Sequence, residues 1–213
     1  MHNEDIFFPC NKLVFNPILM LLIIFMVPSF ELYAEESELS PILLFGLTYG
    51  GDTLIDVELD DAPDEKIKAG SLVYIGGGLN YQELDQPWSV QLNLAYHFDY
   101  TEGDIEDTSL DVEVSFDRFV IELIPYYQFD NNYKVGLGIF KPTYAEFIYD
   151  IEDSPDREIE FESNIGLIAE WCYSMTQESW IVLRYAHIEY EAKELQRQSI
   201  DGSYFGAFFH WIF

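Results

Sequence analysis

The chain has 213 residues, with 10 Lys and Arg against 39 Asp and Glu, which is a formal net charge of −29. This excess of negative charge excludes nucleic acid as a partner, because such binding needs a basic surface to neutralise phosphates. Hydrophobic residues make up 49% of the chain and aromatic residues 17%, which excludes a disordered polypeptide. One folded domain of ordinary size is expected.

The longest uninterrupted apolar run lies near the N-terminus, from Ile18 to Val27. At about ten residues it is too short for a typical membrane-spanning helix, which needs about 20. It fits the apolar region of a secretory signal peptide, and Leu32-Tyr33-Ala34 offers a cleavage site after it. We therefore expect residues 1–34 to be a signal peptide and residues 35–213 to be the exported domain. An uncleaved membrane anchor is the alternative.

From residue 40 onward, apolar side chains alternate with polar or small ones. The clearest stretch runs from Trp88 to Tyr100, where every second residue is aromatic or aliphatic. This period of two is typical of a β-strand, since successive side chains point to opposite faces. Seven further stretches share the pattern, at 43–49, 73–81, 119–129, 133–139, 161–173, 181–185 and 205–213. The sequence thus predicts an all-β fold of about eight strands.

The apolar faces and the connections distinguish a membrane barrel from a soluble sandwich. The apolar faces are continuous and bounded by aromatic residues, as lipid-facing strands require. Long connections, at 51–68, 101–111, 150–160 and 191–201, alternate with short ones at 82–87, 130–132 and 174–178. Outer-membrane barrels have short periplasmic turns and longer external loops. We therefore predict a transmembrane antiparallel up-and-down β-barrel with both ends on the periplasmic side.

The alternation breaks at two places. Val112, Val114 and Phe116 are out of phase with the stretch that follows, which predicts a bulge or the membrane boundary near Asp117. Pro142 cannot donate a ladder hydrogen bond, so it should also lie at a bulge or rim. A tight turn at 130–132 would place Pro142 opposite Val120, so that the two irregularities adjoin.

The chain ends with aromatic residues at alternate positions, namely Phe205, Phe209, Trp211 and Phe213. This segment resembles the closing strand of outer-membrane barrel proteins, and residues 35–213 are similar to small eight-stranded barrels of the OmpA and OmpW types. The resemblance implies location in the outer membrane of a Gram-negative cell. It also implies that the barrel assembly machinery reads these four residues as an assembly signal. No OmpW-type motif and no peptidoglycan-binding domain are found, so the resemblance leaves the activity open.

Polar residues in the phase opposite the apolar faces should line the lumen. An eight-stranded barrel is only wide enough for side chains or one small ligand. We expect a polar network of Arg118, Glu122, Glu170 and Arg184, with Glu170 and Arg184 as charge partners one diagonal step apart. The wider predicted lumen set adds Gln91, Asn93, His97, Asp99, Gln128, Lys134 and Asn164. This set fits either a satisfied polar plug or a gated pore in which Arg and Glu exchange partners.

Catalytic patterns are weak in this sequence. His187 could approach Glu189 and either Ser109 or Ser199 at the outer rim, but no nucleophile motif surrounds these residues. The chain also contains no glycine-rich phosphate loop after a strand and no Cys/His metal cluster. We therefore expect neither an enzyme nor a cofactor.

The predicted external loops are rich in carboxylates. Asp60, Asp61 and Asp64 are candidate ligands for a divalent cation, although their spacing differs from that of an EF-hand. The alternatives are a solvated acidic surface and a rim bridged by divalent cations to lipopolysaccharide phosphates. Lys141 lies in the outward phase, eight residues beyond Tyr133, which places it roughly 20 Å up the wall. We expect Lys141 to contact lipopolysaccharide there.

Together these patterns predict a structural, surface-exposed outer-membrane scaffold with acidic external loops and a polar, side-chain-filled lumen. Membrane lipid and lipopolysaccharide are the expected partners, with the barrel assembly machinery and divalent cations. A narrow porin-like conduit for small solutes is the alternative function, followed by a surface adhesin or receptor.

Overall fold

The computed structural model describes residues 37–57, 65–104, 111–151, 157–193 and 199–213. These described residues form thirteen strands. Among them, no helix is long and apolar enough to cross a membrane. The expected signal peptide lies outside the described residues, as do Asp60, Asp61 and Asp64.

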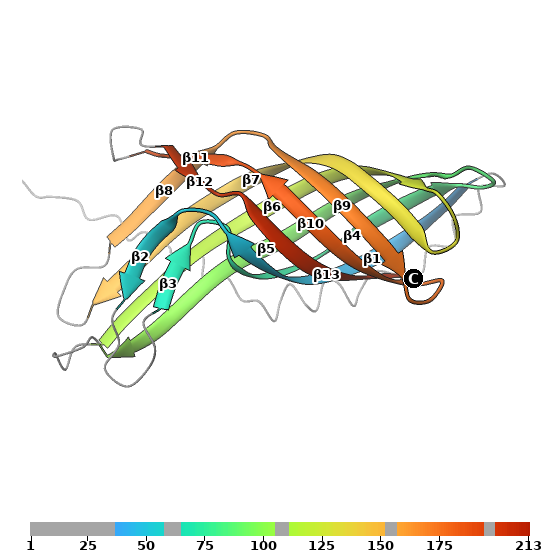
Figure 1. Ribbon diagram of the computed structural model, residues 1–213. Helices are drawn as coiled ribbons and strands as arrows, with labels where there is room; N and C mark the ends of the chain where they lie inside the picture. The colour runs from blue at the N-terminus through green and yellow to red at the C-terminus, as the bar shows by residue number, and fades with distance from the viewer. Residues whose placement is uncertain (1–36, 58–64, 105–110, 152–156, 194–198) are drawn as a thin grey trace, which may run out of the picture. The chain divides into compact units, whose positions relative to one another are not determined.

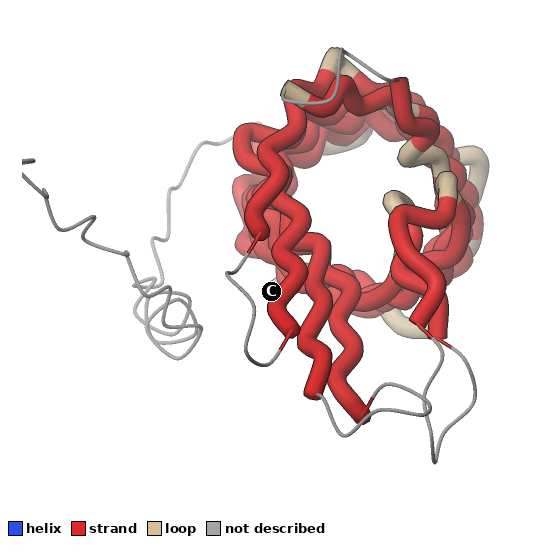
Figure 2. The backbone as a smooth tube through the Cα atoms, turned by 90° about the vertical axis from the view of Figure 1, so that its left-hand side faces the viewer, coloured by secondary structure: helices blue, strands red, loops and turns tan. Residues whose placement is uncertain are grey.

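Eight of the described strands close into a barrel (Figures 1 and 2). Its wall consists of β1 (Ser37–Gly50), β4 (Leu72–Glu83), β5 (Trp88–Asp104), β6 (Asp111–Gln128), β7 (Tyr133–Ile151), β9 (Gly166–Ser174), β10 (Ser179–His187) and β13 (Tyr204–Ile212). Each wall strand pairs antiparallel with its neighbours, and β13 pairs with β1 to complete the ring. The predicted all-β, eight-stranded, up-and-down barrel is confirmed.

The strands are staggered around the ring. A path through paired residues leaves β1 at Thr48, passes Gly206, Arg184, Glu170, Gly136, Tyr126, Ser89 and Gln82, and returns to β1 at Glu38. One circuit therefore shifts the register by ten residues, the difference between positions 48 and 38. In a closed barrel, stagger and strand tilt accompany one another, and eight strands leave an interior that side chains can fill.

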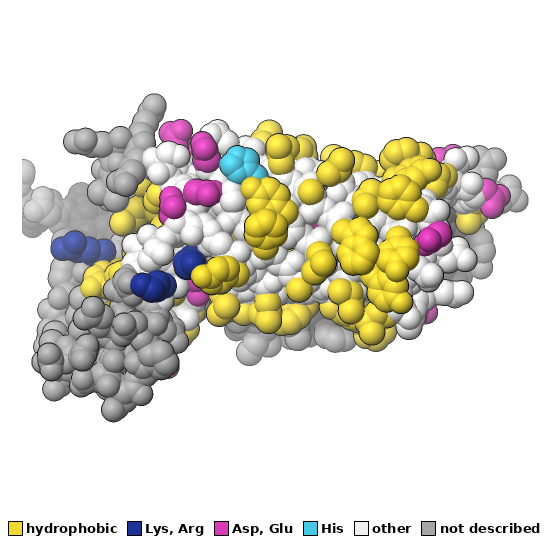
Figure 3. Space-filling model, viewed as in Figure 1, with side chains coloured by type: hydrophobic (Ala, Val, Ile, Leu, Met, Phe, Trp, Pro, Cys, Tyr) yellow, Lys and Arg dark blue, Asp and Glu magenta, His cyan; other side chains and the backbone are white. Residues whose placement is uncertain are grey.

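The outer surface of the wall carries an apolar belt (Figure 3). Outward leucines in it are largely exposed, for example Leu47 at 54%, Leu92 at 50% and Leu137 at 69%. Aromatic side chains border the belt at both ends. Those near the short turns include Trp88, Tyr133, Trp171, Trp211 and Phe213, and those at the opposite end include Tyr49, Tyr144, Tyr185 and Phe205. Only a hydrocarbon environment makes such exposure favourable, so the barrel spans a membrane.

The connections between wall strands alternate between long and short as predicted, but the long ones contain strands. The short turns span 84–87, 129–132 and 175–178. Large parts of the predicted long loops are strands instead, because β5, β6 and β7 continue beyond the belt. The further strands at this end are β2 (Thr53–Val57), β3 (Glu65–Lys68), β8 (Arg157–Ser163), β11 (Glu189–Ala192) and β12 (Ser199–Asp201). We call the outer parts of β5–β7, together with β8, β11 and β12, the extramembrane sheet.

The predicted single strand over 161–173 is wrong, because it consists of β8 and β9 with a break at Asn164-Ile165. Both pair with β7, β8 along its outer part and β9 along its inner part. The break reverses the phase, so Phe161 points inward and is buried rather than facing lipid. Asn164 is exposed at the break and does not line the lumen.

Of the two alternatives predicted near Asp117, the structure agrees with the membrane boundary and not with a bulge in β6. β6 pairs with β5 without interruption, and Val112, Val114 and Phe116 point inward in the same phase as Arg118. The pattern changed because the interior becomes apolar beyond the belt, not because the strand shifts. The bulge lies in β7 at Thr143, between the pairs Phe119↔Tyr144 and Val120↔Pro142. Pro142 does lie opposite Val120, as predicted.

The narrow lumen makes one glycine of β4 a sensitive position. A Cβ added at Gly78 would press against the carbonyl oxygen of Leu92 and against Asn93. Because these are backbone and lumen atoms of the paired strand, Gly78→Ala should destabilise the barrel by about 1–3 kcal/mol, the usual cost of overpacking. At the neighbouring Gly77 the nearest atom would be 3.1 Å away, so Gly77→Ala is the matched control and should cost less. Urea unfolding of the refolded barrels measures both, and equal losses would contradict this account.

Candidate functional site

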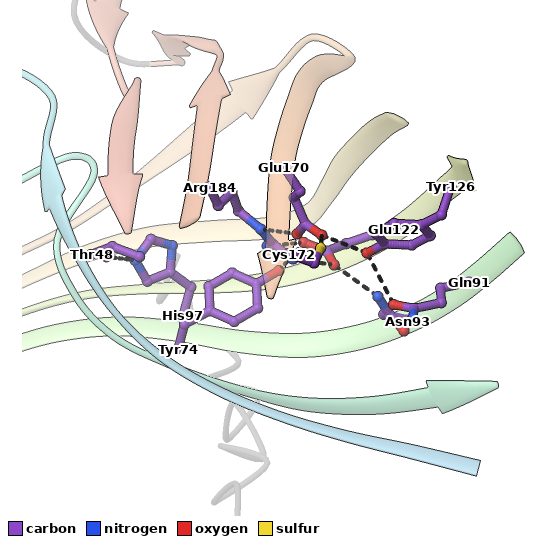
Figure 4. A network of polar contacts seen from close by, with 10 residues as sticks. All are labelled: Thr48, Tyr74, Gln91, Asn93, His97, Glu122, Tyr126, Glu170, Cys172 and Arg184. Atoms are coloured by element: carbon purple, nitrogen blue, oxygen red, sulfur yellow. Dashed lines mark hydrogen bonds and ion pairs between the residues drawn. The ribbon is translucent and has the colours of Figure 1, made fainter. Parts of the chain in front are cut away.

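The centre of the lumen is occupied by an ion-pair network around Arg184 (Figure 4). Arg184 comes from β10, Glu170 from β9 and Glu122 from β6, so three wall strands converge on one guanidinium. These side chains point inward because each lies in the phase opposite the apolar belt. In both ion pairs, all the side chains involved have a relative exposure of 0%.

The guanidinium of Arg184 engages the two carboxylates with different nitrogens. Its Nε donates to Oε1 of Glu170 at 2.6 Å. Its two terminal nitrogens donate to both oxygens of Glu122, at 2.6 and 3.2 Å. Such a forked contact holds Arg to a carboxylate in one orientation. Glu170 and Arg184 are direct cross-strand partners, rather than one diagonal step apart as the sequence suggested.

Neutral donors complete the coordination of the two carboxylates. Glu122 accepts a short hydrogen bond from the Tyr74 hydroxyl and a 3.1 Å bond from Nδ2 of Asn93. Glu170 accepts a 2.5 Å bond from the Tyr126 hydroxyl. Sequence reasoning missed both tyrosines, because an aromatic residue was counted as apolar. Their inward phase would have identified them, since Tyr126 shares the parity of Glu122 on β6.

Arg118 lies apart from this network, contrary to expectation. Its guanidinium donates to the backbone carbonyls of Ala69 and Ser71, the latter at 2.7 Å. These carbonyls belong to the turn between β3 and β4, which folds inward and is buried. Arg118 therefore fastens that turn to the inside of the wall and does not contact Glu122. Sequence could not reveal this, because the path of the β2–β3 hairpin depends on tertiary packing.

The lumen is electrically balanced although the chain is strongly acidic. Among the described residues, the buried inward-facing charges are the cations Arg118, Lys134 and Arg184 and the anions Asp99, Glu122 and Glu170. Lys134 has no carboxylate within ion-pair distance in the described part of the chain. Its Nζ lies over the rings of Tyr126 and Trp180, at 4.5 and 4.4 Å from their centres. Because the charges in the lumen cancel, the net negative charge of the chain lies outside the lumen, where water solvates it.

Among the described residues, the catalytic candidates His187, Glu189 and Ser199 form no triad. Nδ1 of His187 lies 2.7 Å from Oγ of Ser203, a serine that sequence reasoning did not select. The nearby Asp201 accepts a bond from the backbone N–H of Ser203 at 2.8 Å. Within the described ranges, the imidazole of His187 has the Ser203 hydroxyl as its hydrogen-bonding partner and no carboxylate. Ser199 lies on β12, and Ser109 lies outside the described residues.

The remaining sequence-predicted sites lie on the wall. Lys141 is exposed on the outward face of β7, and its Nζ donates to the carbonyl oxygen of Ser163. Phe205, Phe209, Trp211 and Phe213 are all exposed on the outer face, at β13 and the residue after it. Among the described residues, no group of three or more His, Cys, Asp and Glu could hold a metal ion.

Comparisons with known proteins yield structural similarity only. No family model matches the chain, and no curated protein is significantly similar to it. Similar solved structures include the attachment invasion locus protein Ail of Yersinia pestis, in complex with the heparin analogue sucrose octasulfate, at 14% identity and a TM-score of 0.45 over 84% of this chain and 99% of that chain. Neisserial surface protein A is 9% identical, with a TM-score of 0.46 over 83% and 99%. The outer-membrane protease OmpT from Escherichia coli is 10% identical, with a TM-score of 0.35 over 84% and 96%.

At these identities no ligand, activity or residue role passes from those proteins to this chain. The chain's own features identify its location. A closed antiparallel barrel with an apolar outer belt, two aromatic borders and a polar interior is the architecture of bacterial outer-membrane proteins. The protein is therefore an outer-membrane β-barrel of a Gram-negative cell.

The ion pair between Glu170 and Arg184 should show strong coupling. Glu170→Gln leaves Arg184 with Glu122 as its remaining carboxylate partner, and Arg184→Gln leaves two buried carboxylates without their cation, a loss that typically costs about 3–5 kcal/mol. The double replacement should cost less than the sum of the two single losses. Urea unfolding in a double-mutant cycle measures the difference, with the exposed Glu178→Gln as a control for loss of negative charge. Additive losses would contradict a coupled pair.

Proposed function

We propose that this protein is a closed outer-membrane scaffold that presents a folded acidic sheet beyond the membrane. The observation that carries the proposal is the Arg184 network, because two carboxylates, from the strands on either side of β7, hold one guanidinium at zero exposure. A conduit needs a continuous wet path through the lumen. At the level of Arg184, side chains occupy the space that such a path would require.

The apolar interior beyond the belt supports the proposal that the extramembrane sheet is a folded surface presented outside the membrane. Phe116, Phe161 and Tyr190 contact one another edge to face, with ring centres 5.5 to 6.3 Å apart. Val112, Val114 and Ile188 are buried beside them in the same apolar cluster. An apolar core holds the extramembrane sheet in a defined shape, which suits a surface that is presented to the surroundings.

A narrow conduit is the competing function, and conductance separates the two. Purified wild-type protein in a planar bilayer should give no steady unitary steps, because the Arg184 network fills the lumen. The triple variant Glu122→Ala, Glu170→Ala and Arg184→Ala removes the three side chains at that level and should begin to conduct. Glu178→Ala on a short turn is the matched control and should stay silent. Steady steps from the wild type would overturn the closed scaffold.

We also propose that Lys141 contacts a lipopolysaccharide phosphate. Lys141 is paired with Ile121 at the edge of the apolar belt, so its stem can lie on apolar surface while the ammonium reaches outward. One N–H of the ammonium is used by the carbonyl of Ser163, and two donors remain. Divalent cations would then reduce repulsion between lipid phosphates and the acidic sheet beyond.

The lipid contact can be tested by thermal unfolding in bilayers with and without lipopolysaccharide. Lys141→Gln should lower the melting temperature by about 2–4 °C, corresponding to a loss of about 1 kcal/mol, only where lipopolysaccharide is present. Lys193→Gln removes an exposed cation that pairs with Glu160 instead, and it is the matched control. Chelation at constant ionic strength should also lower the melting temperature. Equal effects of Lys141→Gln in both bilayers would contradict the phosphate contact.

A further inference from the structure

Carboxylates face carboxylates across three strands of the extramembrane sheet. Asp117 on β6 is paired with Glu146 on β7, and Glu146 is paired with Glu160 on β8. Glu158 lies two residues from Glu160 on the same face of β8. Like charges directly opposite one another destabilise a sheet. This row therefore needs compensation, and each carboxylate has a different neighbour.

Two members of the row have conventional partners. Asp117 accepts a 3.3 Å bond from the Ser115 hydroxyl, and Tyr96 of β5 also hydrogen-bonds to it. Glu160 forms an ion pair with Nζ of Lys193, beyond the end of β11. Hydroxyl donors thus stabilise the carboxylate of Asp117, and a cation lies beside the carboxylate of Glu160.

Glu146 is the member of the row that has no such partner among the described residues. It is 6% exposed, the most buried carboxylate of the row, and its hydrogen-bonding neighbour is Glu158. Its other charged neighbours, Asp117 and Glu160, are acidic as well. Two carboxyl groups can hydrogen-bond to each other only when one of them carries a proton.

The position of Glu146 gives this proton a structural role. β8 is attached to β7 by four pairs in the described residues, from Glu146↔Glu160 to Tyr149↔Arg157. β11 pairs with β8, and β12 pairs with β11. The β7–β8 contact therefore joins β8, β11 and β12 laterally to the rest of the extramembrane sheet.

We propose that Glu146 and Glu158 share a proton that fastens β8 to β7, so that this side of the extramembrane sheet loosens in alkaline medium. The device is independent of whether the lumen conducts. When the shared proton leaves, two adjacent negative charges face each other beside Asp117 and Glu160, and the first pair of the β7–β8 ladder separates.

The direction of the pH effect follows from the surroundings of Glu146. Burial, then Glu158, then Asp117 and Glu160 raise its pKa from 4.5 to about 8. A carboxyl group whose pKa is higher in the folded state stabilises the fold when protonated. That stability is fully present below the ordinary pKa and is lost as the pH rises through about 8.

Amide hydrogen exchange on the refolded barrel in lipid nanodiscs, corrected for intrinsic rates, tests the proposal between pH 6 and 10. Protection of β8 and β11 amides should fall by up to about tenfold per pH unit from pH 6 to about 8 and then level off, while β9 and β10 stay protected. Glu146→Gln keeps a hydrogen-bond donor without the charge and should remove this pH dependence. Glu113→Gln, on the same face of β6 opposite Asp150, is the matched control and should behave as wild type.

Two results would overturn the proposal. One is protection of β8 that does not change between pH 7 and 10 in the wild type. The other is a Glu146→Gln variant whose pH dependence matches that of the wild type. If Glu146→Gln fails to fold, carboxyl carbon NMR of the wild-type protein decides the matter, because a Glu146 titration midpoint below pH 6 contradicts a shared proton at neutral pH.

Discussion

Closure of the hydrogen-bonded ring is the constraint on which the rest of this structure depends. No water is available in a bilayer core to bind unpaired backbone groups, so a membrane sheet must pair its last strand with its first. Here β13 pairs with β1 from Ile42↔Ile212 to Gly50↔Tyr204. Eight strands closed with a ten-residue stagger leave a narrow lumen. The size of the interior, the inward glycines and the need for a filling network all follow from that closure.

The interior of the barrel changes from polar to apolar along the barrel axis. Inside the belt it is a charge-balanced network centred on Arg184, whereas beyond the belt it is an aromatic cluster around Phe116 and Phe161. Inside the membrane the apolar surface faces outward to lipid, so polar residues are left for the lumen. Beyond the membrane the outer surface faces water, so apolar residues turn inward as in a soluble protein.

The placement of polar residues in the lumen also explains how so acidic a chain folds. Buried charges require partners, and the lumen holds equal numbers of buried cations and anions among the described residues. The uncompensated carboxylates are thereby placed on outer surfaces. Most are solvated there, and the row that contains Glu146 is an exception because it is partly buried between strands. Its ionisation then depends on how closely β7 and β8 approach.

The barrel, its outward faces, the short turns and the pairing of Pro142 with Val120 could all be predicted from the amino-acid pattern. These follow from a period of two and from turn lengths, which are local properties. The contacts among lumen residues, in contrast, depend on how the strands pack around the ring. Glu122 and Arg184 are 62 positions apart, and their contact depends on the stagger of the whole ring. Packing beyond the belt likewise determines the inward fold of the β2–β3 hairpin onto Arg118 and the break between β8 and β9. In that region the alternation of apolar and polar residues no longer shows whether an apolar side chain faces lipid or an apolar core.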